Sequence, residues 1–161
     1  MVVPIYKNMG DIQNYSNYRG IKLMIHTMKL WDGVIERRLR NLTIVSKNQF
    51  GFMPSRSTTE GIFLLRQVIE RYKEEHKSLH IAFIDLEKAY DRVPKFGDCL
   101  GGRKCLNAMS ISIRICMKDC NKCLLSGGMS NEFSILVGLH QGSTLSPYLF
   151  ALVMDELTRH L

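Results

Sequence analysis

A carboxylate at the end of an apolar run is the feature of this sequence with the clearest chemical meaning. Residues 79–85 (LHIAFID) are rich in β-branched and aromatic side chains, and period-two alternation puts Phe83 and Asp85 on one face of a predicted strand. Both faces are largely apolar, so we expect both to be buried. Removing a carboxylate from water is costly unless it is paired, hydrogen-bonded or bound to a cation. Asp85 is therefore a candidate ligand of a divalent cation, with an aromatic residue, Tyr90, five positions later.

A structural explanation of Asp85 is also available. Asp is a good N-cap, and the same residue could end the strand and cap a helix that starts near Glu87. Taken alone, Asp85 does not decide between these two roles. The neighbouring sequence blocks do.

Four blocks of sequence occur in a fixed order along the chain. They are residues 17–23 (NYRGIKL), 49–58 (QFGFMPSRST), 84–91 (IDLEKAYD) and 138–150 (GLHQGSTLSPYLF). Together they closely resemble the reverse transcriptase domain of non-LTR (LINE-type) retrotransposons, over residues 2–94 and 132–161. Four ordered blocks are far more specific than any one of them.

The resemblance implies an α+β fold, with a small antiparallel sheet packed on helices. It implies one partial domain over residues 1–161, with residues 1–78 similar to the fingers and residues 79–161 to an incomplete palm. Residues 95–131 depart from the family pattern, and three glycines near residue 100 would each cost a helix about 1 kcal/mol. We interpret this stretch as divergent.

The resemblance also implies roles for single residues. Asp85 matches the first catalytic aspartate, which binds Mg²⁺. Tyr90 matches the aromatic residue beneath the incoming sugar, which rejects a 2′-hydroxyl by its bulk. Gln141 and Gly142 match the pair that lines the nascent base pair, where glycine permits close approach of the backbone.

Two arginines match fingers residues that meet phosphates, Arg56 and Arg19. Such arginines would neutralise charge on the departing pyrophosphate, while Mg²⁺ would take oxygen ligands from carboxylates and from substrate phosphates. The partners implied are an RNA template, a DNA primer and deoxynucleoside triphosphates. Charge agrees, because 13 Lys/Arg against 7 Asp/Glu in residues 1–80 carry most of the net +7. A basic solvated face without a partner is the alternative.

One part of the family pattern lies outside this sequence. In the family the Gln-Gly block is followed by a hairpin bearing Tyr/Phe-Ala-Asp-Asp, which supplies the remaining metal-binding carboxylates. After residue 140 the only acids are Asp155 and Glu156, in a predicted helix where the family has no metal ligands. We therefore expect no polymerase activity from this chain alone. The alternatives are a non-catalytic nucleic-acid-binding remnant and an unstable pseudogene product.

Three helices are predicted from apolar periodicity and capping signals. Residues 21–40 carry a stripe that includes Trp31 and Leu39, both expected in the core. Ser57 to Glu60 form a capping box that starts a second helix. Ser146 as cap and Pro147 at the first position start a third, whose inward residues are Leu149, Leu152, Val153 and Leu157.

The remaining composition gives a location and leaves the cysteines open. With no signal peptide and no apolar run long enough to span a membrane, we expect an intracellular protein, nuclear or cytoplasmic. Five cysteines argue against a disulfide framework. Cys116, Cys120 and Cys123 approximate zinc spacing without a second ligand pair, so unpaired thiols are the default.

Overall fold

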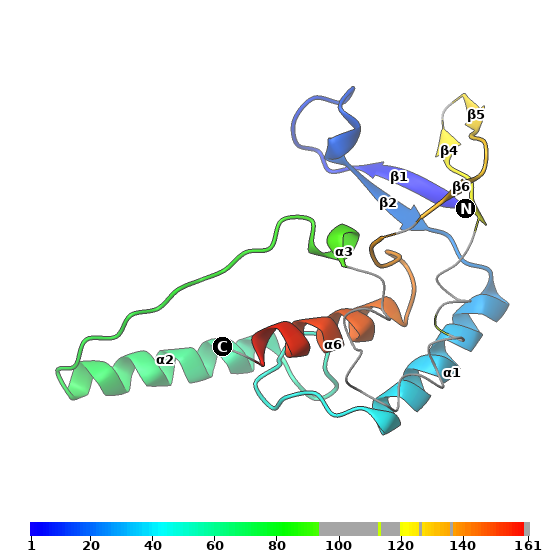
Figure 1. Ribbon diagram of the computed structural model, residues 1–161. Coiled ribbons are helices and arrows are strands. Elements are labelled where there is room, and N and C mark those ends of the chain that lie inside the picture. The colour runs from blue at the N-terminus through cyan, green and yellow to red at the C-terminus, as the bar shows by residue number, and fades with distance from the viewer. Residues whose placement is uncertain (94–112, 114–119, 126, 136, 160–161) are drawn as a thin grey trace.

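The computed structural model describes residues 1–93, 113, 120–125, 127–135 and 137–159 (Figure 1). Helices and small antiparallel sheets both occur, which confirms the predicted α+β class. Most of the stretch predicted to be divergent, residues 95–131, lies outside the described residues, as do Cys99, Cys105 and Cys116.

The helices and strands follow the chain in the order shown in Figure 1. The strands are β1 (Val2–Tyr6), β2 (Tyr18–Lys22), β3 (Cys120–Asn121), β4 (Leu124–Leu125), β5 (Gly128–Met129) and β6 (Phe133–Ser134). The helices are the 3-10 turn η1 (Tyr15–Asn17) and the α-helices α1 (His26–Leu42), α2 (Thr58–Glu74), α3 (Ala89–Arg92) and α6 (Ser146–Thr158).

Three two-stranded antiparallel sheets are formed, by β1 with β2, β3 with β6, and β4 with β5. In the first of them Val2 lies opposite Lys22, and Tyr6 lies opposite Tyr18. The amide of Val2 also donates to the carbonyl of Lys122 at 2.7 Å. This bond joins the N-terminal sheet to the segment between β3 and β4.

Helix α1 begins later than predicted and buries a different residue. The prediction that the helix starts at residue 21 is wrong, because residues 18–22 pair with β1 as strand β2. Leu39 is buried as predicted, whereas Trp31 is 51% exposed. The next residue, Asp32, is only 1% exposed and takes the inward position instead. Asp32 can be buried there because it finds a hydrogen-bond donor in Ser143.

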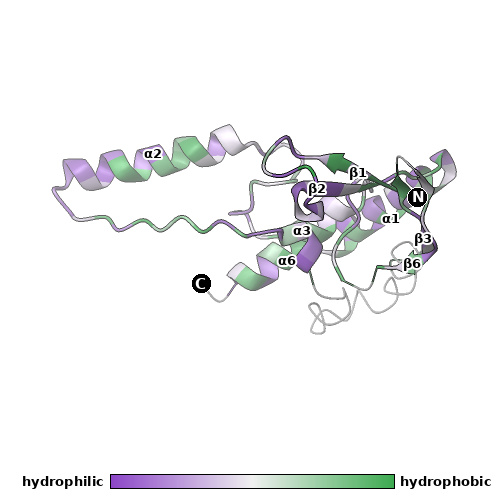
Figure 2. Ribbon diagram, turned by 90° about the horizontal axis from the view of Figure 1, so that it is seen from above, coloured by the Kyte–Doolittle hydropathy of each residue, from purple (hydrophilic) through white to green (hydrophobic). Residues whose placement is uncertain are grey.

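Helix α2 and the segment after it extend away from the rest of the molecule (Figures 1 and 2). The predicted cap is confirmed, since the Ser57 hydroxyl accepts from the amide of Glu60 at 3.2 Å. No residue of α2 is buried within the described structure. Its apolar stripe therefore lacks a partner among the described residues.

The predicted buried strand at residues 79–85 is wrong. Residues 77–86 run as an extended segment without strand pairing in the described part of the chain, and residues 80–88 are exposed. Phe83, for example, is 82% exposed. A strand forms only where a neighbour satisfies its backbone donors and acceptors, and here no described segment does so.

The core lies between α1, α6 and the segments that enter α6. Helix α6 begins at Ser146 itself, with Leu145 as the cap residue, so the prediction of Ser146 as cap is displaced by one position. Leu157 is 61% exposed, contrary to the prediction that it packs inward. The buried apolar cluster consists of Ile35, Leu39, Val93, Ile113, Leu139, Leu145, Tyr148, Leu149, Leu152 and Val153.

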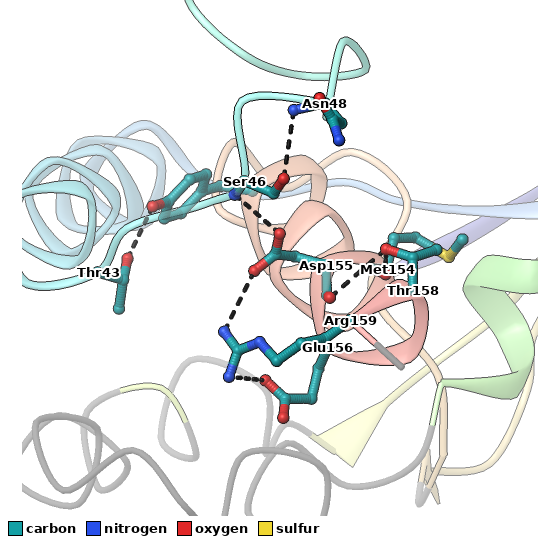
Figure 3. A network of polar contacts seen from close by, with 9 residues as sticks. Thr43, Ser46, Asn48, Met154, Asp155, Glu156, Thr158 and Arg159 are labelled. Atoms are coloured by element: carbon teal, nitrogen blue, oxygen red, sulfur yellow. Dashed lines mark hydrogen bonds and ion pairs between the residues drawn. The ribbon is translucent and has the colours of Figure 1, made fainter. Parts of the chain in front are cut away.

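Polar contacts fix α6 to the loop after α1 (Figure 3). The side chain of Asp155 accepts from the amide of Ser46 at 2.8 Å and lies 3.6 Å from the Arg159 guanidinium. Glu156 pairs with the same arginine at 3.3 Å. Both acids that follow residue 140 are thus engaged in contacts that stabilise the helix.

Candidate functional site

An open cleft of about 610 Å³ lies between the N-terminal sheet, α3 and the segment that leads into α6. It brings together four of the six predicted site residues, Arg19, Tyr90, Gln141 and Gly142. The other lining residues are Lys7, Met9, Lys88, Ala89, Asp91, His140, Ser143, Ser146 and Pro147.

The Gln141–Gly142 turn is held against the edge of β2. The amide of Lys22 donates to the carbonyl of Gln141 at 2.7 Å, and Ile21 forms a parallel bridge with Gln141. Gly142 has φ +105°, and a Cβ atom there would lie 2.7 Å from the carbonyl oxygen of Lys22. Only glycine adopts this conformation without strain and leaves room for the neighbouring strand.

Tyr90 is fixed beside the same turn by its backbone. Its carbonyl accepts from the amide of Leu139 at 2.7 Å, and the amide of Gly138 donates to Val93 at 2.9 Å. A Cβ at Gly138 would lie 2.8 Å from the carbonyl of Asp91, so the two segments touch backbone to backbone. Backbone contacts therefore join helix α3 to the segment that leads into the Gln141–Gly142 turn.

The ring of Tyr90 is held by two other aromatic residues. It stacks on Phe150, with ring centroids 4.7 Å apart and an interplanar angle of 18°. Phe52 contacts both rings edge-on, each at 6.2 Å. Burial raises the pKa of the Tyr90 hydroxyl above its usual 10.0, so the phenol stays neutral at physiological pH. The ring presents a rigid, uncharged surface to the cleft.

Three cations from separate segments line the cleft, Lys7, Arg19 and Lys88. None of them pairs with a carboxylate among the described residues, although the Lys7 ammonium donates to the carbonyl of Ser16 at 3.2 Å. Their charges are therefore available to an anion. Sequence reasoning did not identify Lys7, which reaches the cleft because β1 pairs with β2 and ends beside it. Lys88 lies inside the block that contains Asp85, which was the available signal.

Asp85 does not line the cleft. It is exposed in the extended segment, and its carboxylate makes no hydrogen bond or ion pair with any described residue. The capping alternative is excluded by the structure, since α3 begins at Ala89 with Lys88 as its cap. We expected Asp85 to be buried and to need a partner for that reason, whereas the side chain is exposed. Its carboxylate is free to accept a ligand.

Arg56 also lies outside the cleft, at the start of α2. Its guanidinium is 3.2 Å from Glu60 and lies over the ring of Phe50 at 5.4 Å. The predicted position just before a helix N-terminus is confirmed. Its role toward phosphates stays a prediction.

The metal prediction requires several carboxylates at one point. Among the described residues, no three or more His, Cys, Asp or Glu side chains gather in a way that could hold a metal ion. The carboxylates of Asp85 and Asp91 are six positions apart across a turn, and only Asp91 faces the cleft. These two carboxylates by themselves do not fit a Mg²⁺ site.

The cleft is suited to a ligand that carries both phosphates and a flat ring system. Its cations can bind phosphates, and Tyr90, an aromatic residue, lies in its lining beside the Gln141–Gly142 turn. These features come from segments that are far apart in the sequence.

No helix in the described part of the chain is long and apolar enough to cross a membrane.

Comparison with known proteins gives a consistent result. The family model described as reverse transcriptase (RNA-dependent DNA polymerase) matches residues 5–161. A Retrovirus-related Pol polyprotein from type-1 retrotransposable element R2 of Popillia japonica is 28% identical over 156 residues, covering 92% of this chain and 21% of that protein. The Probable RNA-directed DNA polymerase from transposon BS of Drosophila melanogaster is 26% identical, covering 97% of this chain and 18% of that protein. The chain thus spans about a fifth of the length of these relatives.

Proposed function

Because the chain belongs to the reverse transcriptase (RNA-dependent DNA polymerase) family, we propose that it forms the fingers and part of the palm of a retrotransposon polymerase. In this proposal residues 1–78 are the fingers and residues 79–161 the palm. The complete enzyme copies an RNA template from a DNA primer with deoxynucleoside triphosphates. Residues 1–161 supply its nucleotide-binding cleft.

One observation carries the proposal. Arg19, Tyr90 and the Gln141–Gly142 pair come from three separate sequence blocks, and they line one cleft. Sequence resemblance alone does not require that these residues meet in space. Their convergence supports a shared ligand, and the cleft chemistry suits a nucleoside triphosphate.

The proposed roles are those that the family resemblance implies, and the shared cleft supports them. The carboxamide of Gln141 and the backbone of Gly142 lie against the base pair being formed. The Tyr90 ring lies under the sugar, held in place by Phe150. Arg19, with Lys7 and Lys88, binds the triphosphate. Arg56 is placed outside this group and meets phosphate of the template or of the nucleotide as it enters.

Asp85 is proposed to supply one metal-binding carboxylate. Its segment is extended, apolar and unpaired within the described residues, which suits a strand that pairs with a segment other than the described ones. Such pairing would cover Phe83 and its neighbours and turn Asp85 toward other carboxylates. Mg²⁺ is the cofactor expected for the complete enzyme, since it uses few protein ligands and takes the rest from phosphates and water.

The first experiment compares two polypeptides. A polypeptide of residues 1–161 alone is expected to show no primer extension on an RNA template with Mg²⁺ or Mn²⁺, because a single candidate carboxylate cannot hold two catalytic ions. The full-length polypeptide that contains these residues is expected to extend the primer. Template-dependent incorporation by residues 1–161 alone would contradict the first expectation, and absence of extension by the full-length polypeptide would contradict the proposed function.

A non-catalytic nucleic-acid-binding module is the second candidate. It is favoured by the lack of a metal-binding cluster among the described residues and by the three cleft cations, which pair with no described carboxylate. The same two polypeptides separate it from the first. Retention of a primer–template duplex that weakens steeply with salt, without extension by either polypeptide, would support this second candidate.

Sugar selection gives a direct test of Tyr90. Tyr90→Ala in the full-length polypeptide is expected to raise incorporation of ribonucleotides relative to deoxyribonucleotides by about a hundredfold, because the bulk under the sugar is removed. Tyr90→Phe keeps the ring and is expected to leave the ratio within about threefold. Single-nucleotide incorporation with paired ribo- and deoxyribonucleotides measures both. An unchanged ratio in the Ala variant would exclude Tyr90 from the sugar site.

A further inference from the structure

We propose that Asp32 is a positioning residue that holds the Gln141–Gly142–Ser143 turn against helix α1. The consequence for nucleotide binding rests on the function proposed above. The positioning itself rests only on contacts within the chain. Asp32 lies in none of the four sequence blocks that carry the family resemblance.

The contact joins two segments that are 111 positions apart. The hydroxyl of Ser143 donates to Oδ2 of Asp32 at 2.5 Å. The same hydroxyl oxygen accepts from the amide of Leu145 at 3.2 Å. With one bond given and one received, the Ser143 side chain has a fixed orientation immediately after Gly142.

Asp32 is an expensive residue at this position. It is 1% exposed, and its Oδ1 has no hydrogen-bond partner among the described residues. A buried carboxylate with one bond costs several kcal/mol relative to an apolar residue of similar size, by order of magnitude. Packing alone would favour an apolar side chain on this face of α1. The structure retains an acceptor where Ser143 needs one.

The turn is therefore fastened on both sides. Strand β2 holds Gln141 through the Lys22 amide, and α1 holds Ser143 through Asp32. Gly142, between them, is the residue whose backbone approaches the nucleotide in the proposed function. Release of the Ser143 side leaves the turn attached at one end only, and the Gly142 backbone then loses its fixed position in the cleft.

The test uses the full-length polypeptide that contains residues 1–161, with four variants. Asp32→Ala and Ser143→Ala each remove the hydrogen bond, whereas Asp32→Asn keeps an acceptor for the Ser143 hydroxyl. Thr43→Val is the matched control, because it removes another buried hydrogen bond from the end of α1, the 2.7 Å bond between Thr43 and Tyr148. Each variant is compared for amide exchange at Leu145 and for the KM of the deoxynucleoside triphosphate.

Both alanine variants are expected to speed amide exchange at Leu145 and to raise the KM by about tenfold, since small displacements at a substrate site are costly. The double variant Asp32→Ala/Ser143→Ala should be no worse than Ser143→Ala alone, because Ser143→Ala already removes both the bond to Asp32 and the bond from the Leu145 amide. Asp32→Asn should stay within about twofold of the wild type in both measurements. Thr43→Val should lower the melting temperature without changing the KM.

Three results would overturn the inference. They are unchanged amide exchange at Leu145 in Asp32→Ala, an Asp32→Asn variant as defective as Asp32→Ala, and a KM increase in Thr43→Val as large as that in Asp32→Ala. If the wild-type polypeptide incorporates no nucleotide, the proposed function fails. In that case amide exchange at Leu145 alone still tests whether Asp32 positions the turn.

Discussion

Replacing Asp85 with Asn is expected to lower deoxynucleotide incorporation by the full-length polypeptide by roughly a thousandfold or more. The change keeps the shape of the side chain but removes its negative charge and one of the hard oxygen ligands that Mg²⁺ prefers. Because Asp85 is exposed and has no partner among the described residues, its loss should not destabilise the fold. Steady-state primer extension and the melting temperature measure the two effects separately.

Glu87→Gln is the matched control for this experiment. Glu87 lies two positions away, is exposed, and pairs with Arg92 at 3.5 Å on the surface. It loses the same charge, and exposed pairs of this kind contribute about 0–1 kcal/mol to stability. Activity close to wild type is expected. If Asp85→Asn kept about a tenth or more of the wild-type activity, Asp85 would not be a catalytic ligand.

Gly142→Ala is expected to lower the free energy of unfolding by about 2–4 kcal/mol and to abolish nucleotide binding. The new Cβ would lie 2.7 Å from the Lys22 carbonyl oxygen, and φ +105° is a conformation that alanine rarely adopts. The close neighbour is backbone, so it cannot rotate away as a flexible side chain could. Either β2 or the turn must shift, and the cleft loses its shape.

Gly33→Ala is the corresponding control. Gly33 lies within α1, and a Cβ there would meet nothing within 4 Å. Alanine favours a helix over glycine by about 1 kcal/mol, so this variant should be slightly more stable than wild type with unchanged nucleotide binding. Chemical denaturation and nucleotide titration would measure both variants. Equal behaviour of the two would show that Gly142 has no special conformational role.

Local signals in the sequence predicted the helices well. The Ser57 cap starts α2 as expected, and α6 begins within one residue of the prediction. The predicted start of α1 at residue 21 failed because residues 21 and 22 end strand β2, which pairs with β1, and the helix begins at His26. A strand that depends on a partner outside the local sequence cannot be recognised from helical periodicity alone.

The exchange of Trp31 for Asp32 on the buried face of α1 has a similar cause. Apolar periodicity places the large side chain inward, yet the inward position belongs to the residue that bonds with Ser143. The prediction of a buried strand around Asp85 was wrong for a different reason. Its apolar pattern predicts burial, but no described segment covers it.

Four residues of the cleft were predicted through the family resemblance, namely Arg19, Tyr90, Gln141 and Gly142. The structure adds how they meet. Tyr90 and Gln141 are near each other because Leu139 bonds to the carbonyl of Tyr90 within α3, and Gly138 bonds to the carbonyl of Val93 just after it. Lys7 and Asp32 could not be identified in advance. Lys7 reaches the cleft through the pairing of β1 with β2, and Asp32 reaches its place through a bond with Ser143. Neither residue lies in a recognisable motif.

The hydrogen bond from Lys22 to Gln141 limits the order in which parts of the protein can fold during synthesis. The two residues are separated by more than a hundred positions, so during synthesis β2 leaves the ribosome long before its neighbour exists. Helices α1 and α2 can form locally in that interval, whereas the turn cannot bond to β2 until residues 141 and 142 have been synthesised. Long loops close slowly because their entropy is lost before the contact is gained. The binding cleft is thus a late product of folding, completed only after both of its walls have been translated.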